Sequence, residues 1–547
     1  MRNVEVVLFL VVLGTVVAAF AGRLRIPAPS LLVIAGLAVG LLPWVPAVRV
    51  PPETVSLVVL PPLLYAASEE LPWRELRAVW RPVVILAVGL VLASAAAVAV
   101  VAGAVAGIPA SLAFVLGSVL ASTDPVAVSA LGRRLSLPPR VQALVQAESL
   151  FNDGTSLVLF QIAVGFAVAG TAGSAGAGSV LLHGAARFAV LTAGGAAAGA
   201  AVGAGVVLLR RRVTDPVLET VVALVTPYAA YVLGTALHVS PVLAVIVTGL
   251  VIGGRRERIT SAQSRLQLHS VYQTVIFLLE SVVFSLIGLQ LPTLIRALSD
   301  SSQAWLAEAL AVTGTLIVAR MLWVFPLSAV AQRRGGARRP SWPVPAVVSW
   351  AGTRGVVPLA AALSIPLTDA AGAPLPDRDL ILVLAIAAIV ISLVVQGLTL
   401  GPLVRLAGIA RPGDAHQEEA AARLRLAQAA LTRLDELAEE AMAAGASPEG
   451  ASPDGASAAD DAIDRARATL EARIRRAQAR VDDSRAGDRL APEPGRLTDR
   501  ELRRALNAAE HAELARLYDE AAISQATRQS LQRSLDLEAT RLSDDHH

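Results

Sequence analysis

The chain has 547 residues, of which 54% are apolar, and it carries a formal charge of +3. All 47 basic residues are arginine and cysteine is absent, so disulfides, thiolate nucleophiles and cysteine metal sites are excluded. Repeated uncharged stretches of about 20 residues, each enough to cross ~30 Å of hydrocarbon, exclude a soluble globular protein. Nucleic-acid binding is not indicated either, because the arginines stand at the ends of apolar segments, where they act as topology signals.

Residues 1–410 are predicted to form an all-α polytopic membrane domain. The first segment ends in Ala19-Phe20-Ala21, a signal-peptidase-like pattern, but Glu5 and a lone Arg2 make a poor n-region, so a retained helix is favoured over a cleaved signal. Hydropathy predicts about thirteen transmembrane helices, near residues 4–21, 28–47, 54–68, 82–106, 110–131, 138–168, 178–209, 214–236, 239–253, 268–292, 304–331, 344–365 and 379–405.

Arginine is distributed very unevenly between alternate loops of this domain. One set of loops carries 19 arginines and the opposite set only five. The positive-inside rule therefore predicts an external N-terminus and a cytoplasmic C-terminus in the inner (plasma) membrane of a bacterium, which agrees with an odd number of helices.

Residues 411–547 are predicted to form a cytoplasmic helical tail, because acids outnumber arginines only here. Helical runs are expected near 415–444, 460–483 and 498–541, with a possible apolar seam of Leu424, Leu431, Leu434 and Leu437. Both a regulatory domain and a merely solvated tail fit this composition.

Six ionisable side chains fall inside predicted spans, where a charge requires a partner or a function. They are Asp124, Glu148, Asp153, Glu280, Arg320 and Arg354. Four acids and two bases cannot all pair, so at least one carboxylate remains to bind a proton or a cation.

The run Ser122-Thr123-Asp124-Pro125 lies in the middle of the fifth predicted helix. Proline removes a backbone donor and clashes with the preceding turn, so the helix is expected to break there. Freed carbonyls and half-helix ends are typical of an ion site at the membrane midplane. The alternative is a simple proline kink capped by Asp124.

The run from Glu148 to Asp153 places oxygen-bearing side chains on adjoining strips of one helix, with Glu148 near Asn152 and Ser149 near both Asn152 and Asp153. Hard cations prefer such oxygens, and a carboxylate removed from water can alternate between a proton and a metal ion. Asp153 is the predicted shared carboxylate, and the other predicted cation- or proton-binding residues are Asp124, Thr123, Ser149 and Asn152. The alternative is that these groups only join helices through hydrogen bonds.

Two arginines and one further acid complete the set. Arg320 and Arg354 cannot lose their charge and are predicted to form structural ion pairs, and Glu280 is a further structural partner with no assigned mate. Glycines on both sides of Arg354 would allow a second broken helix to cross the first.

At these residues the sequence resembles the cation:proton antiporter superfamily, specifically the bacterial electroneutral Na⁺/H⁺ exchangers. The resemblance covers about residues 5–410 and is carried by five motifs in order: LPPLLY (60–65), TDPVAV (123–128), ESLFNDGTSL (148–157), GTRGVVP (352–358) and VQG (395–397).

The resemblance implies two inverted six-helix repeats and two crossed broken helices. It also implies a homodimer with elevator-type movement, no enzyme activity and no cofactor. Transported Na⁺, K⁺ or Li⁺ would compete with H⁺ at a site formed by Asp153, Asp124, Thr123 and Ser149, while Glu148 would pair with Arg320.

The electrogenic branch of the superfamily has two adjacent aspartates at this site and a lysine in its core. This chain has Asn152-Asp153 and no lysine, which predicts electroneutral exchange. It also has Ala66 after Tyr65, where many relatives have an acid that bears on ion preference.

Other functions are less favoured. A K⁺/H⁺ antiporter would need almost the same residues, and an ion channel could use the same acids without exchanging protons. An intramembrane aspartyl hydrolase could use Asp124 and Asp153, but its glycine-flanked motif is missing. The seven histidines show no H-E-x-x-H spacing, which argues against a metalloenzyme.

Overall fold

The chain is almost entirely helical. In its described part, the only β-type pairing is an isolated bridge between Thr368 and Pro374. The computed structural model describes residues 2–24, 27–42, 56–124, 139–169, 177–213, 215–255, 262–298, 304–334, 341–369, 372–408, 412–445, 453–482 and 500–544.

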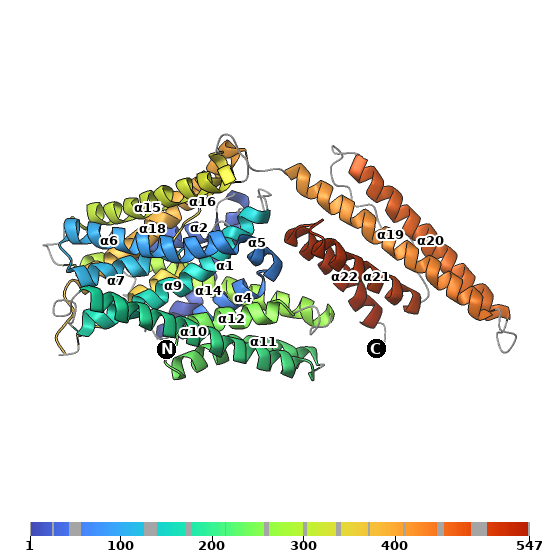
Figure 1. Ribbon diagram of the computed structural model, residues 1–547, viewed down its shortest axis with the longest axis horizontal. Helices are drawn as coiled ribbons and strands as arrows, with labels where there is room; N and C mark the ends of the chain where they lie inside the picture. The colour runs from blue at the N-terminus through green and yellow to red at the C-terminus, as the bar shows by residue number, and fades with distance from the viewer. Residues whose placement is uncertain are drawn as a thin grey trace. The chain divides into compact units, whose positions relative to one another are not determined.

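The chain divides into two compact units. The first comprises residues 1–259 and 270–410, and the second comprises residues 260–269 and 411–547. The helices of the first unit run roughly alongside one another (Figure 1). They are α1 (Arg2–Leu24), α2 (Ala28–Gly40), α4 (Leu60–Glu69), α5 (Trp73–Val84), the π-helix η1 (Ile85–Leu90), α6 (Val91–Ala106), α7 (Ala110–Leu120), α9 (Pro139–Ala169), α10 (Ala177–Arg210), α11 (Pro216–Ala236), α12 (Pro241–Gly253), α14 (Ala262–Ala297), α15 (Trp305–Arg334), α16 (Pro343–Trp350), α17 (Val356–Leu363) and α18 (Arg378–Ala407).

Seven helical stretches in the described residues are long and apolar enough to cross a membrane, and five shorter helices are also apolar. The prediction of an all-α multi-pass membrane protein is therefore confirmed. The exact number of thirteen spans and the inverted repeats stay predictions. The fourth predicted span begins earlier than expected, at Trp73 instead of residue 82, because α5, η1 and α6 form one continuous stretch whose first turns are amphipathic.

Two predicted spans are not continuous helices. α7 ends at Leu120, and residues 122–124 are non-helical, so the chain leaves the helix before Pro125, which lies outside the described residues together with the rest of that span. The span predicted at 344–365 is divided into α16 and α17 by the non-helical residues 352–355.

An apolar core joins the helices that surround these breaks. Leu86 of η1 and Val145 of α9 pack with Val324 of α15, Val347 of α16 and Val404 of α18. α18 is the most buried of the long spans, so it is the central element of this core. The core fixes α9 and α18 beside the two interrupted helices.

The second unit contains the tail helices α19 (Pro412–Gly445), α20 (Pro453–Asp482), α21 (Arg500–Asp519) and α22 (Gln525–Asp544). Two long helices, α19 and α20, lie side by side, with α21 and α22 beside α19 (Figure 1). The unit also includes the first turns of α14, where Arg265 forms a bidentate ion pair with Asp536 of α22.

One tail prediction was wrong, because the single helix expected at 498–541 is a helical hairpin. The turn contains Ala521 with φ of 59°, and the hydroxyl of Ser524 accepts a hydrogen bond from the main chain of Thr527. No glycine or proline marks the turn. Burial of apolar side chains stabilises the turn, because folding back places Ile523 and Leu531 in one buried cluster with Leu514.

The predicted leucine seam of α19 is largely present. Leu434 is fully buried, and Leu431 and Leu437 pack around it against α20 and α21. Leu424 is only half-buried, and the neighbouring Leu426 takes its place in the core of the hairpin.

The tail also buries an acid whose ionisation should control its stability. Burial raises the pKa of Glu510 from the ordinary 4.5 to about 7, against the opposing effect of Arg473, whose guanidinium lies 3.0 Å away, and with a further contribution from Glu538. Because the folded tail binds this proton more tightly than the unfolded chain, its stability should fall as pH rises from about 5 to about 7 and then level off.

We expect Glu510→Gln to remove the fall in tail stability with rising pH. At pH 8 the variant should stabilise the folded tail by up to about 3 kcal/mol, and at pH 5 it should change the stability of the tail little. Hydrogen exchange of α21 in the full-length protein, corrected for the intrinsic pH dependence of exchange, measures the effect. Burial lowers the pKa of the adjacent His511 in both proteins, so their difference isolates Glu510. Equal protection of the two proteins at pH 8 would contradict the prediction.

Candidate cation-binding site

The two interrupted helices meet at their non-helical segments. The main-chain N–H of Asp124 donates to the carbonyl of Thr353 at 2.7 Å, and the hydroxyl of Thr353 donates to the carbonyl of Asp124 at 2.9 Å. Backbone groups that lose their helical partners within a membrane must find others inside the protein. Each break thus supplies hydrogen-bond partners for the other.

α9 places a carboxylate and a hydroxyl against the first break. Asp153 is buried, and its Oδ1 accepts a hydrogen bond from the hydroxyl of Ser122. One turn earlier, the hydroxyl of Ser149 donates to the carbonyl of Thr123. Side-chain and main-chain oxygens from two segments therefore converge at this point.

Asn152 locks Thr123 in place. Its Nδ2 donates to the hydroxyl of Thr123 at 2.6 Å, and its Oδ1 accepts from the main-chain N–H of Thr123 at 3.3 Å. The same Nδ2 donates to Oε1 of Glu148 at 3.1 Å. Asn152 is thus a positioning residue whose hydrogen-bonding atoms are engaged by neighbours.

Glu148 and Arg320 form a fully buried ion pair. Nη1 and Nη2 of Arg320 lie 2.7 and 2.6 Å from the two carboxylate oxygens, and Nε and Nη2 each lie 3.2 Å from the carbonyl of Val348. This bidentate geometry satisfies both charges, whereas removal of one partner would leave a buried charge at a cost of about 3–5 kcal/mol. A side chain on Gly352 would come within 2.7 Å of Cδ of Arg320, so glycine is needed here for close approach.

Arg354 binds main-chain oxygens at the first break. Its Nη1 donates to the carbonyl of Ser122 at 2.8 Å, and its main-chain N–H donates to the hydroxyl of Ser392 at 2.7 Å. One turn along α18, Nε2 of Gln396 donates to the carbonyl of Trp350 at 3.3 Å. α18 thereby satisfies backbone groups at both ends of the second break.

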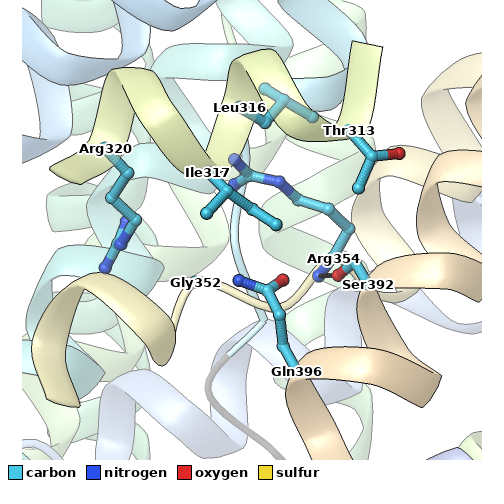
Figure 2. Close-up of a pocket in the computed structure, with 8 residues that line it drawn as sticks. All are labelled: Thr313, Leu316, Ile317, Arg320, Gly352, Arg354, Ser392 and Gln396. Carbon is cyan, nitrogen blue, oxygen red and sulfur yellow. Dashed lines mark hydrogen bonds between the residues drawn. The ribbon is translucent and has the colours of Figure 1, made fainter. Parts of the chain in front are cut away.

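We call the place where the non-helical segments 122–124 and 352–355 meet the crossing. A small cavity lies beside it, between α15, the segment 352–355 and α18 (Figure 2). Guanidinium, hydroxyl and amide groups line it, from Thr313, Arg320, Arg354, Ser392 and Gln396. Two guanidinium groups and no carboxylate are among its lining residues, which makes it unsuitable for a cation. The oxygen-rich surroundings of Asp153 are therefore the better candidate.

The structure brings together eight of the nine residues that the sequence singled out: Thr123, Asp124, Glu148, Ser149, Asn152, Asp153, Arg320 and Arg354. The ninth residue, Glu280, lies half-buried on α14, and its role as a structural partner stays a prediction.

Sequence reasoning assigned no role to Ser122, Thr353, Ser392 or Gln396. Ser122 and Thr353 directly adjoin residues that were singled out. Ser392 and Gln396 are polar residues four apart in a stretch of α18, residues 380–398, that is otherwise apolar. That spacing places both on one face of α18 and is the signal that could have found them.

Comparison with known proteins identifies this architecture. The profile of the family described as "Sodium/hydrogen exchanger, transmembrane" matches residues 7–406. The chain belongs to the sodium/hydrogen exchanger family. As a member, it is a secondary transporter and not an enzyme, which confirms both expectations.

Several relatives of this exchanger match most of its membrane domain. An uncharacterized Na⁺/H⁺ exchanger of Mycobacterium tuberculosis is 39% identical over 440 residues, which cover 79% of each chain. The Na⁺/H⁺ antiporter ApNhaP of Aphanothece halophytica is 31% identical over 75% of each chain. The solved structure of the sodium proton antiporter MjNhaP1 from Methanocaldococcus jannaschii has a TM-score of 0.59 at 20% identity and covers 75% of this chain and 100% of that one, so the exchanger shares its fold.

Proposed function

We propose that this chain exchanges Na⁺ for H⁺ across the bacterial plasma membrane. The observation that carries the proposal is the convergence of carboxylate, hydroxyl and carbonyl oxygens where the two helix breaks meet beside Asp153. Hard cations prefer oxygen ligands, and broken helices frame ion sites in many secondary transporters. The name of the A. halophytica relative, a Na⁺/H⁺ antiporter, supports Na⁺ as the cation.

The balance of charge at the crossing supports Asp153 as the group that alternates between cation and proton. Arg320 balances Glu148, which leaves Asp124, Asp153 and Arg354 with a net charge of −1. Arg354 cannot release its proton. One Na⁺ or one H⁺ therefore restores neutrality. Asp153 is the acid of α9 that has no arginine partner in this balance, and it accepts a hydrogen bond from Ser122 at the first helix break.

The proposed cation ligands are oxygens of Asp153, Asp124, Ser149 and Thr123, with Asn152 holding Thr123 in position. The hydroxyl of Ser149 and the carbonyl of Thr123 now bond to each other, so both oxygens already point to the same place. Each keeps a lone pair with which it can bind a cation.

Alternate loading of one carboxylate by one cation or one proton makes the exchange electroneutral in this proposal. Access alternates by an elevator-type movement of the crossing within a homodimer, as the family resemblance implies. The arginine-rich loops face the cytoplasm, with the N-terminus outside and the tail inside.

The test is transport by purified protein in liposomes that contain a pH-sensitive dye. After a pH gradient is imposed, addition of Na⁺ should produce a protein-dependent recovery of the dye signal, with a weaker response to K⁺. A response to K⁺ that equals or exceeds the response to Na⁺ would replace the proposed substrate, and no response to Na⁺, K⁺ or Li⁺ would refute cation/proton exchange.

The same liposomes test electroneutrality. With a membrane potential set by K⁺ and valinomycin, the initial rate of Na⁺-driven proton movement should not change with voltage. A current on addition of Na⁺ would show net charge movement, and a current without coupled proton movement would favour a channel.

A further inference from the structure

The outer face of α5 carries an unusual combination of exposed aromatic and basic side chains. Trp73 and Trp80 are 50% and 52% exposed, and Arg77 and Arg81 are also exposed. At about 100° per residue, these four side chains fall within an arc of about 100°. We call this set (Trp73, Arg77, Trp80 and Arg81) the α5 outer face.

The flank of α5 next to Trp80 is anchored in the membrane domain. Leu76 and Val83 are buried there, and α5 packs along α9, the helix that carries Asp153. α5 continues through η1 into α6, and the next exposed residues on this stretch, Val84 and Ile85, are apolar. The outer face therefore lies where the helix enters the hydrocarbon, at the level of lipid headgroups.

The two arginines of the outer face keep their charge available. Each guanidinium lies over a tryptophan ring, Arg77 at 5.4 Å from the centre of the Trp73 ring and Arg81 at 5.7 Å from that of Trp80. Stacking orients a guanidinium without neutralising it and leaves its N–H edge open. Neither arginine forms an ion pair with any described residue.

The spacing of the arginines favours a shared anion. Arg77 and Arg81 are four residues apart, so their like charges adjoin and repel on one helix face. The one acid of α5, Glu75, is about 160° away from Arg77 around the helix. A phosphate group between the guanidinium groups would remove the repulsion and accept hydrogen bonds from both.

We propose that the α5 outer face binds the headgroup of an anionic phospholipid. The tryptophans pack against the glycerol and upper acyl region, as interfacial tryptophans do, and the arginines hold the phosphate. Because α5 packs on α9, the bound lipid stabilises the helix that positions the cation site. This inference depends on the membrane location of the domain and is independent of which cation is exchanged.

The test is the thermal unfolding of full-length protein in detergent with added phosphatidylglycerol or the zwitterionic phosphatidylethanolamine. Phosphatidylglycerol should raise the Tm of the wild type more, and Arg77→Gln/Arg81→Gln should reduce that rise by roughly half or more. Arg333→Gln/Arg334→Gln is the matched control, because it removes the same charge from the exposed last turn of α15. The control should keep the wild-type response.

Three outcomes of this test would overturn the proposal: a wild-type response in Arg77→Gln/Arg81→Gln, an equal loss in the α15 control, or an equal rise of Tm with inorganic phosphate in place of lipid. If the double variant does not fold, native mass spectrometry of the wild type decides. Retention of phosphatidylglycerol in preference to phosphatidylethanolamine, reduced by competing anionic detergent, supports the site, and equal retention of both lipids refutes it.

Discussion

Replacing Asp153 by asparagine should reduce Na⁺-driven proton movement in liposomes to the level of protein-free vesicles. Asparagine has nearly the same shape and can still accept the hydrogen bond from Ser122. It cannot bind and release a proton, and it gives a cation no negative charge. Loss of transport in a folded variant would therefore report on the chemistry of the carboxylate, not on its packing.

The matched control for this variant is Glu308→Gln, because Glu308 is an acid of the membrane domain in the first turn of α15, outside the crossing. It makes the same change from carboxylate to amide and should exchange at the wild-type rate. Size-exclusion chromatography and thermal unfolding establish that both variants fold. Cation-dependent proton movement that survives in Asp153→Asn would mean that another acid, with Asp124 the first candidate, carries the proton.

The residues of the site that share one helix could be predicted from sequence, because helical periodicity fixes their relative positions. The spacing of Glu148, Ser149, Asn152 and Asp153 places them on adjoining strips of α9 wherever that helix lies. The break before Pro125 followed from the chemistry of proline in the same local way, and residues 122–124 are non-helical. These inferences needed no knowledge of the tertiary fold.

Contacts between segments could not be predicted in this way. Glu148 and Arg320 are 172 residues apart, and spacing alone could not pair Arg320 with Glu148 in preference to another buried acid; family resemblance supplied that pair. The bonds between Asp124 and Thr353 join two non-helical segments, whose geometry follows no sequence period. They depend on the packing of α9, α15 and α18 around the crossing.

The error in the tail has a related cause. The run from Arg500 to Asp544 has good helix formers throughout, so local propensity favours one long helix. The hairpin is more stable than one long helix because Ile523 and Leu531 become buried in one cluster with Leu514 and Tyr518. This burial of apolar surface is possible only when the chain folds back. Tertiary burial overrides local propensity here, as it commonly does.

Replacing Gly355 by alanine should lower the rate of exchange by about 100-fold, because a functional group displaced by about 1 Å loses its productive geometry. A Cβ at this position would overlap the carboxylate of Asp124 and lie 2.6 Å from its Cβ. The main-chain N–H and carbonyl of Asp124 both form hydrogen bonds with Thr353, so Asp124 cannot move away without disturbing the crossing.

Gly314→Ala on α15 is the control, since no neighbouring atom lies within 4 Å of its added Cβ, and this variant should exchange at the wild-type rate. Wild-type exchange by a folded Gly355→Ala protein would show that transport does not require the Asp124 carboxylate in this position, and would remove Asp124 from the proposed cation ligands.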